Sequence, residues 1–172
     1  MKRFISVSAC LLIGSALAHG PTPRRLTESV DIAAPPAKVW RLAGDFGGIA
    51  QWHPLVAKAS VDKGNQADSQ RDMTLKNGAH LIESMDFYDA AKMTYTYRLM
   101  NEDVQKFAVS FYSATLTVTG SGNASHVEWV GNFYRADTQN EPAENMNDDA
   151  AEKTMKEFLD SGLQGLKQAA EH

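Results

Sequence analysis

The sequence predicts an α+β domain in which a curved antiparallel sheet of about seven strands wraps around one long C-terminal helix, with two short helices after the first strand. Short runs of alternating apolar and polar residues recur between residues 26 and 134. Turn signals such as Asn77-Gly78 separate these runs, and strands joined by short turns must be antiparallel. From residue 151 onward, apolar residues return at helical spacing.

Length and composition indicate one ordinary globular domain. The chain has 172 residues, of which 43% are hydrophobic, well above the content of a disordered chain. The formal net charge is −4, with acids and bases interspersed. Nothing in this charge pattern provides the basic field that nucleic-acid binding requires.

The N-terminus has the three parts of a secretory signal peptide. Lys2 and Arg3 give it a positive start, an apolar run follows, and Ala16-Leu17-Ala18 is a small-x-small cleavage site. We expect residues 1–18 to be the signal peptide and residues 19–25 a flexible lead-in, which predicts a periplasmic protein. A retained N-terminal anchor is the alternative.

The only cysteine, Cys10, lies inside the predicted signal peptide. The mature chain would then have no disulfide, no cysteine nucleophile and no thiolate metal site. A domain without disulfides must be held together by its core alone.

The pattern of residues 26–62 predicts a strand followed by two short helices and a second strand. Pro35-Pro36 ends the first strand and suits the start of a helix. Gly47-Gly48 ends that helix, and Pro54 closes a second helical turn. The predicted elements are strand 26–34, helix 37–44, helical turn 49–52 and strand 58–62.

Five further strands are predicted before the last helix, at residues 70–75, 79–88, 92–100, 107–119 and 126–134. Within 107–119 the apolar positions shift from odd to even numbers. Because a strand can change face only by inserting a residue, we expect a β-bulge near Phe111-Tyr112, which would bend the sheet.

Residues 137–147 are polar and acidic and predict a loop, and Asn147 or Asp148 is expected to cap the final helix. Gly162 and Gly165 lie within that helix, where a glycine costs up to about 1 kcal/mol relative to alanine. Close approach of another group is a reason to keep them. One helix covers only part of such a sheet, so we expect an internal apolar cavity beside it.

The order of these elements resembles the helix-grip superfamily, also called START-like, Bet v 1-like or polyketide cyclase/dehydrase-like (SRPBCC). The resemblance covers residues 26–171, which we assign as a START-like/SRPBCC domain. Four segments carry it: Val30-Asp31-Ile32-Ala33-Ala34-Pro35 with Val39-Trp40; Asp45-Phe46-Gly47-Gly48 leading to Trp52-His53-Pro54; Ile82-Glu83 with Asp86 and Tyr95-Thr96-Tyr97; and Val127-Glu128-Trp129-Val130-Gly131-Asn132-Phe133.

Within this superfamily, the export signal and the Phe-Gly-Gly…Trp-His-Pro segment look most like MxaD-type proteins. These are small periplasmic proteins that help methanol dehydrogenase work with its cytochrome electron acceptor, and they are not known as enzymes. The resemblance therefore implies a periplasmic dehydrogenase or cytochrome as partner, besides a small apolar or amphipathic molecule.

The resemblance also suggests ligand-binding residues. Lys58, Glu83 and Glu128 match positions that face the cavity and meet the polar end of the ligand in the related plant hormone receptors. Two carboxylates and an ammonium in an apolar cavity would have to be paired or hydrated. The alternative is that strand alternation turns some of them outward, into solvent.

Aromatic side chains on the predicted strands and helix could line the same cavity. The candidates are Tyr95, Tyr97, Tyr112 and Phe158. For any one of them, packing against the C-terminal helix is the alternative role.

No motif predicts a catalytic residue, a metal site or a cofactor. His53 has no acid or nucleophile partner in the sequence pattern, and no His-x-x-x-His pair suggests zinc. Gly-x-Gly-x-x-Gly, Gly-x-Ser-x-Gly and phosphate-loop motifs are absent. The acidic segment 141–149 lacks a calcium-loop pattern and would be a solvated connector or a surface that steers a basic partner.

Three functions remain open from the sequence. The first is a non-enzymatic periplasmic accessory or ligand-binding protein, which would aid a periplasmic redox system such as methanol oxidation. The second is an enzyme of the polyketide cyclase/dehydratase kind, with Glu83 or Glu128 as general acid or base. The third is a carrier of a lipid or another hydrophobic molecule.

Overall fold

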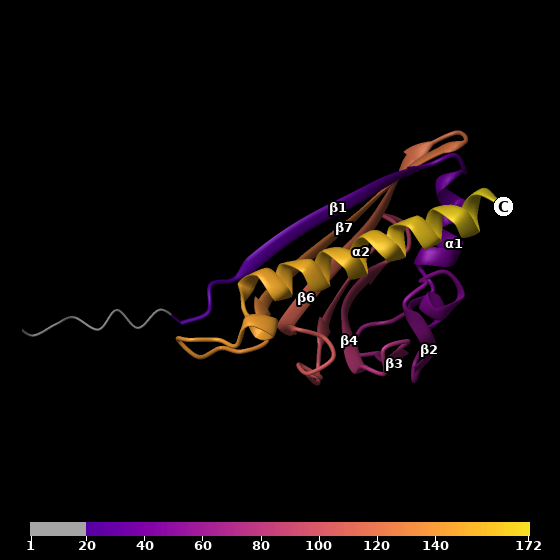
Figure 1. Ribbon diagram of the computed structural model, residues 1–172. Helices are drawn as coiled ribbons and strands as arrows, with labels where there is room; N and C mark the ends of the chain where they lie inside the picture. Colours follow the sequence, from indigo (N-terminus) through magenta and orange to yellow (C-terminus); the bar gives the residue numbers. More distant parts are fainter. Residues whose placement is uncertain (1–19) are drawn as a thin grey trace, which may run out of the picture.

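The computed structural model describes residues 20–172 and has the predicted α+β architecture, with the long helix α2 lying across one face of a curved sheet (Figure 1). All seven strands are antiparallel to their neighbours, in the order β1-β7-β6-β5-β4-β3-β2. The strands are β1 (Arg24–Ile32), β2 (Val56–Val61), β3 (Gln70–Leu75), β4 (His80–Asp89), β5 (Thr94–Leu99), β6 (Val109–Ser121) and β7 (Ala124–Arg135). The helices are α1 (Pro36–Ala43) and α2 (Asp148–Glu171), with short 3-10 helices η1 (Phe46–Gln51) and η2 (Glu144–Met146). The predicted signal peptide and Cys10 lie outside the described residues.

Most predicted elements differ from the observed ones by one to three residues at their ends. β1 begins earlier than predicted, because Arg24 and Arg25 already pair with Phe133 and Asn132 of β7. The second short helix also begins earlier, at Phe46. Pairing with a neighbouring strand decides where a strand ends, and a single run of sequence does not contain that information.

The predicted bulge in β6 is present. The register between β6 and β7 shifts between Ser110 and Ser113, and Phe111 has a left-handed backbone with φ of 47°. As a result the Phe111 side chain is exposed, while Tyr112 turns into the buried interior. The bulge therefore decides which aromatic ring reaches the core.

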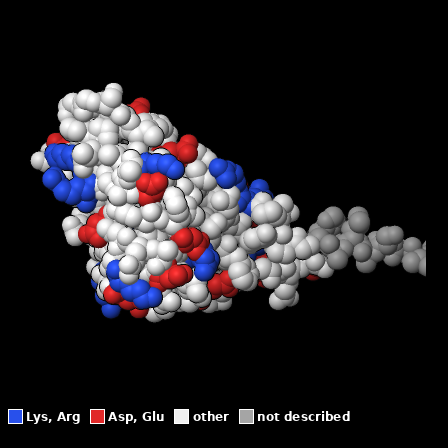
Figure 2. Space-filling view, turned by 180° about the vertical axis from the view of Figure 1, so that it is seen from behind, with Lys and Arg blue, Asp and Glu red and all other residues white. Residues whose placement is uncertain are grey.

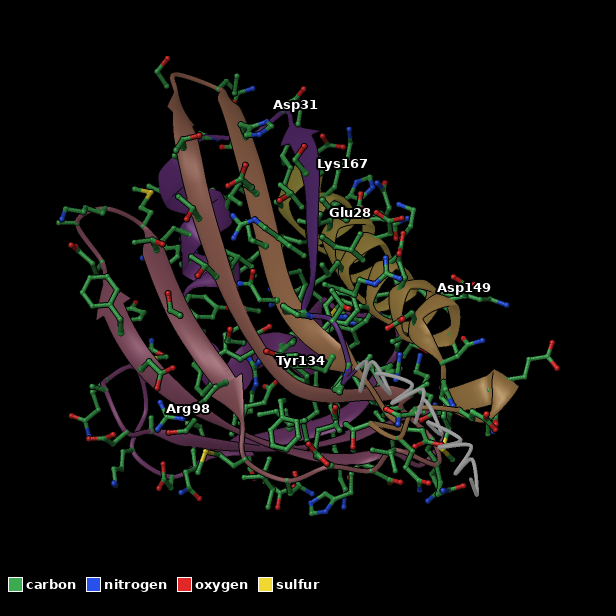
Figure 3. The ribbon with its side chains drawn as sticks, turned by 90° about the vertical axis from the view of Figure 1, so that its left-hand side faces the viewer. Glu28, Asp31, Arg98, Tyr134, Asp149 and Lys167 are labelled. Atoms are coloured by element: carbon green, nitrogen blue, oxygen red, sulfur yellow. The ribbon has the colours of Figure 1, made fainter. Side chains whose placement is uncertain are left out.

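A row of charged contacts fastens α2 along β1. Lys156 of α2 reaches Glu28 at 2.8 Å, and Lys167 donates to the main-chain oxygen of Asp31 at 2.9 Å. Figure 3 shows Glu28 and Asp31 on β1 beside Lys167 on the helix. α2 packs mainly against β1 and β7, so it covers the half of the sheet formed by β2, β3 and β4 less closely.

The two glycines of α2 lie where another group comes close to the helix, as the sequence suggested, and the structure shows that this group is the Trp52-His53-Pro54 segment. A Cβ on Gly162 would lie 2.6 Å from the Trp129 ring and 2.7 Å from the His53 ring. A Cβ on Gly165 would overlap the carbonyl oxygen of Trp52. Both positions therefore need a residue without a side chain.

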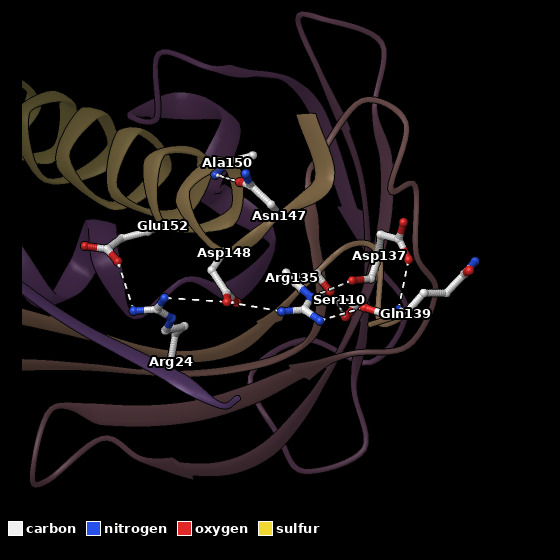
Figure 4. A network of polar contacts seen from close by, with 9 residues as sticks. All are labelled: Arg24, Ser110, Arg135, Asp137, Gln139, Asn147, Asp148, Ala150 and Glu152. Carbon is white, nitrogen blue, oxygen red and sulfur yellow. Dashed lines mark hydrogen bonds and ion pairs between the residues drawn. The ribbon is translucent and has the colours of Figure 1, made fainter. Parts of the chain in front are cut away.

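Arg135 anchors the start of α2 (Figure 4). Its guanidinium is mostly buried and donates to the main-chain oxygens of Asp137 and Gln139, both at 2.7 Å, and to the Asp148 carboxylate at 3.2 Å. The Asn147 side chain caps the helix by accepting from the amide of Ala150 at 2.9 Å. These bonds fix the β7–α2 connection and the first turn of the helix.

The surface opposite α2 carries acidic and basic side chains that are interspersed (Figure 2). Within residues 20–172, neither helix combines the length and the apolar character needed to cross a bilayer.

Candidate functional site

The space between the sheet and α2 is filled with side chains over most of its length. Residues from every strand and both α-helices contribute, and the largest of them are at most 2% exposed. They include Trp129, Tyr95, Tyr97, Phe46, Phe133, Ile32, Ile49, Met73, Leu81, Met85 and Leu116. The expected apolar cavity is therefore much reduced, because aromatic rings occupy the hollow that one helix leaves open.

A polar cluster lies inside this apolar core. Arg71 of β3 and Glu83 of β4 are directly opposite each other, both fully buried, and form an ion pair in which Arg71 Nε donates to Glu83 Oε2 at 2.7 Å. The hydroxyl of Tyr112 donates to the other carboxylate oxygen. Arg71 also donates to the carbonyl oxygen of Phe46 at 2.9 Å. Its guanidinium carbon lies 4.0 Å from the centre of the Phe46 ring.

Burial and charge together determine the protonation states of this cluster. Burial is the largest single influence on Arg71 and opposes its charge, but Glu83 together with Tyr95 and Tyr97 outweighs burial, so the pKa of Arg71 is raised. Burial, and then the charge of Glu83, raise the pKa of Tyr97 and of Tyr112 well above the usual value for tyrosine. Burial likewise raises the pKa of Tyr95 to about 12. These shifts keep Arg71 charged and the three phenols neutral at neutral pH.

The structure brings together five of the seven predicted site residues and separates two. Glu83, Tyr95, Tyr97 and Tyr112 meet in the core, and Phe158 joins them from α2. Tyr97 accepts a hydrogen bond from Trp129 Nε1 at 3.1 Å.

The expectation that Lys58 and Glu128 face the interior is wrong. Both side chains are exposed. A register shift between Val56 and Lys58 leaves the lysine on the outer side of the edge strand, and strict alternation along β7 points Glu128 outward when Trp129 points inward. An outward Glu128 also lacks the buried environment that a general acid role would need.

The cation that Glu83 requires is Arg71, which the sequence analysis missed. The signal was available in the Asn77-Gly78 turn. A hairpin centred on this turn pairs Thr74 with His80 and therefore places Arg71 opposite Glu83.

One pocket of about 300 Å³ opens at the end of the hollow that α2 leaves uncovered. It lies between the β3–β4 turn, the loop before β6 and the first half of α2. Its lining consists of Leu55, Leu75, Lys76, Asn77, Lys106, Phe107, Thr154, Glu157 and Phe158. Four of these side chains are apolar and the others bring charged or hydrogen-bonding groups.

Two phenylalanines separate this pocket from the buried polar residues. The Phe107 and Phe158 rings meet edge to face with their centres 5.7 Å apart. Behind Phe107 lies Tyr112, at 6.0 Å, and behind Phe158 lies His53, at 4.3 Å. The pocket is therefore shallow, and the two phenylalanine rings close it off from the packed interior.

His53 is a structural residue in this arrangement. It is 2% exposed, and its Nδ1 accepts a hydrogen bond from the amide of Leu55 at 3.2 Å. Burial lowers the pKa of His53 to about 3, so the imidazole is neutral at physiological pH. Trp129 and Phe158 pack on it, and we find no carboxylate paired with it among residues 20–172.

Residues 20–172 contain no group of three or more histidine, cysteine or acidic side chains placed to hold a metal ion. In the core, Arg71, Glu83 and Tyr112 are bonded to one another, whereas the Tyr95 hydroxyl and His53 Nε2 have no hydrogen-bond partner among residues 20–172. What the pocket offers is therefore shape, apolar contact and a few polar groups at its edge.

The chain belongs to a known family. Residues 23–171 match the family model described as "Polyketide cyclase / dehydrase and lipid transport", and the chain is a member of that family, with the Bet v 1-like helix-grip (SRPBCC) fold. No match was found among curated protein sequences.

Solved structures agree on the fold. XoxI from Bacillus cereus is 28% identical, with a TM-score of 0.69 over 84% of this chain and 94% of that chain. Zhui aromatase/cyclase from Streptomyces sp. R1128 is 16% identical, with a TM-score of 0.67 over 87% and 94% of the two chains. Norcoclaurine synthase from Thalictrum flavum, solved with dopamine and hydroxybenzaldehyde, is 11% identical, with a TM-score of 0.65 over 98% and 96%.

Proposed function

We propose that the chain is an exported ligand-binding protein that holds a small, partly apolar molecule in the pocket between α2, the β3–β4 turn and the loop before β6. The observation that carries this proposal is the pocket itself. It has apolar walls made by Leu55, Leu75, Phe107 and Phe158, and its polar groups come from three different elements. Concave sites with mostly apolar walls and a few polar groups are the usual form of small-molecule sites.

The position of α2 supports the same proposal. Ion pairs hold α2 against β1, and Arg135 holds its first turn. The pocket lies on another side of α2, the one that faces the β3–β4 turn. The same fold holds two small aromatic molecules, dopamine and hydroxybenzaldehyde, in norcoclaurine synthase. A role as carrier or as binding protein needs no catalytic group, and Glu83 is already engaged by Arg71 and Tyr112.

Native mass spectrometry of the protein purified from its own cells tests this proposal. We expect a co-purified small molecule whose mass adds to that of the chain. Thr154→Trp should abolish it, because this position lines the pocket and a larger side chain would fill it. Lys153→Trp, exposed on the same helix, is the matched control and should retain it. Equal occupancy in both variants would contradict the proposal.

A second candidate is an accessory role with a basic redox partner, such as a periplasmic dehydrogenase or cytochrome. The observation favouring it is the acidic segment before α2, where Glu141, Glu144 and Asp149 are exposed while Asp148 is held by Arg24 and Arg135. Attraction between such charges weakens with salt. A defined dehydrogenase or cytochrome should therefore be retained by the protein at low salt and released at high salt, and retention that ignores salt would count against this role.

Export is the part of the proposal that rests on residues 1–18 alone. Its test is N-terminal sequencing of the protein from its own cells. A mature chain that begins near His19 would support it, and an intact Met1 or Lys2 would contradict it.

A further inference from the structure

The polar groups of the pocket are unevenly distributed around its mouth. Two ammonium groups come from the sheet side, Lys76 from the β3–β4 turn and Lys106 from the loop before β6, whereas the α2 side brings Glu157. Lys106 is held in place, since its Nζ donates to the carbonyl oxygen of Gly78 at 3.0 Å and lies 3.9 Å from the Asp103 carboxylate, which offsets part of its charge. Lys76 makes no ion pair with any residue that the structure describes.

The two lysines outnumber Asp103, so the sheet side of the mouth keeps a net positive charge, which Lys76 mainly supplies. Asn77, between the two lysines in space, donates its side-chain amide to the carbonyl oxygen of Lys106 at 2.8 Å and so ties the turn to the loop. The two cationic elements are joined and keep their spacing. Glu157 borders the same pocket from α2, so an anionic group is favoured beside the lysines and away from Glu157.

The depth of the pocket limits what can follow the anion inside. Its volume of about 300 Å³ is at the lower end of the range of about 300–1,000 Å³ for small-molecule sites. The edge-to-face pair of Phe107 and Phe158 closes the bottom, and Phe107 is 3% exposed with Tyr112 directly behind it. A flat apolar group of about one ring fits against this floor.

We propose that the pocket binds a short organic carboxylate with an apolar body of about one ring, that Lys76 and Lys106 hold its anionic group, and that Phe107 limits its length. This inference rests on the proposed function and names the class of ligand for the same pocket. Phe107 acts here as a specificity-determining residue, because its ring fills the space between the pocket and Tyr112.

Calorimetric titration with a matched probe series tests the anionic part. The probes are 3-phenylpropanoate, 3-phenylpropanol and 3-phenylpropylamine, which share the ring and chain and differ in charge. We expect the carboxylate to bind most tightly and the amine least. Lys76→Gln should weaken the carboxylate about threefold to tenfold and leave the alcohol unchanged. Lys58→Gln, an exposed lysine outside this pocket, is the control and should change neither.

A two-ring probe, 3-(2-naphthyl)propanoate, tests the role of Phe107. It should bind the wild-type protein weakly, and Phe107→Ala should improve its affinity about tenfold, since the vacated ring space can hold the second ring. Phe107→Leu, a milder change that keeps an apolar side chain, should give an intermediate gain if the alanine variant does not fold.

The outcomes separate the two proposals. If none of the probes binds the wild-type protein and no molecule co-purifies, the proposed function fails. If the alcohol or the amine binds as tightly as the carboxylate, the anionic assignment fails while the pocket stands. If the folded Phe107 variants bind the two-ring probe no better than wild type does, Phe107 does not set the length.

Discussion

Arg71 and Glu83 carry opposite charges in a core that is otherwise apolar and aromatic. Neither side chain is exposed, and each charge is compensated within the protein by the other. Removal of one partner would leave a buried, uncompensated charge, which costs more than the pair itself contributes. The pair therefore makes the identity of both residues interdependent.

Glu83→Gln should lower the free energy of unfolding by about 3–5 kcal/mol, because Arg71 would remain charged in the core. Arg71→Met should cost a similar amount for the opposite reason. The double variant Arg71→Met, Glu83→Gln should lose clearly less than the sum of the two, as measured by urea denaturation at neutral pH. Additive losses would show that the two side chains do not compensate each other.

His53 gives the stability of the protein a defined dependence on pH. Its pKa is about 3 in the folded protein against 6.5 for an unperturbed histidine, so below pH 6.5 the unfolded chain binds a proton that the folded chain does not. Stability from this residue is complete above pH 6.5 and falls as the pH drops toward 3, by about 1.4 kcal/mol per pH unit.

Denaturation series between pH 7 and pH 4 measure this dependence. His53→Phe keeps an aromatic ring against Phe158 and should remove that part of the slope. His172→Gln, at the exposed C-terminus, should retain the full slope of the wild type. A slope that is the same in all three proteins would show that His53 does not titrate as its burial implies.

The candidate site could be predicted from the sequence only in part. The family resemblance placed Glu83 inside, and the structure buries it. Tyr95, Tyr97 and Phe158 are also buried, as alternation along a strand and helical periodicity allow, and Tyr112 is buried just after the predicted bulge. Lys58 was placed inside incorrectly, because the shift beside it on β2 is invisible in one strand's pattern. Lys76, Lys106 and Phe107 line the pocket from a turn and a loop, where no periodicity indicates direction.

At the scale of elements, α2 is positioned by close packing in its second half and by polar contacts at its start. The Trp52-His53-Pro54 segment packs against Gly162 and Gly165, and Arg135 fixes the first turn. The sequence predicted the extent of this helix, since helical periodicity is a local property. It also predicted a close approach at the two glycines. The hairpin of β3 and β4 was predicted from another local signal, the Asn77-Gly78 turn. The extent of β1, in contrast, depended on its partner β7.

Gly162→Ala and Gly165→Ala should each destabilise the protein by about 1–3 kcal/mol. This loss would occur although alanine favours a helix over glycine by about 1 kcal/mol, because the added methyl group meets the Trp129 and His53 rings in one case and the Trp52 carbonyl in the other. Gln168→Ala, exposed on the same helix, is the control and should change stability little. Thermal denaturation decides, and stabilisation by either glycine substitution would contradict the packing described.

At the scale of the whole molecule, the sheet's hollow is closed in two ways. α2 covers the side of β1 and β7, and aromatic side chains fill much of the remaining space. The part that stays open is the pocket bounded by Phe107 and Phe158. This open end is the site of the proposed ligand.

The central claim is that a small molecule binds in this pocket, and nuclear magnetic resonance tests it most directly. Wild-type protein labelled on its methyl groups and backbone amides would be titrated with 3-phenylpropanoate. We predict shifts of signals from Leu55, Leu75 and Phe107 and none from Lys58 or Glu128, which lie outside the pocket. Shifts confined to the outer face of the sheet, or no shifts at millimolar concentrations of the probe, would contradict the account.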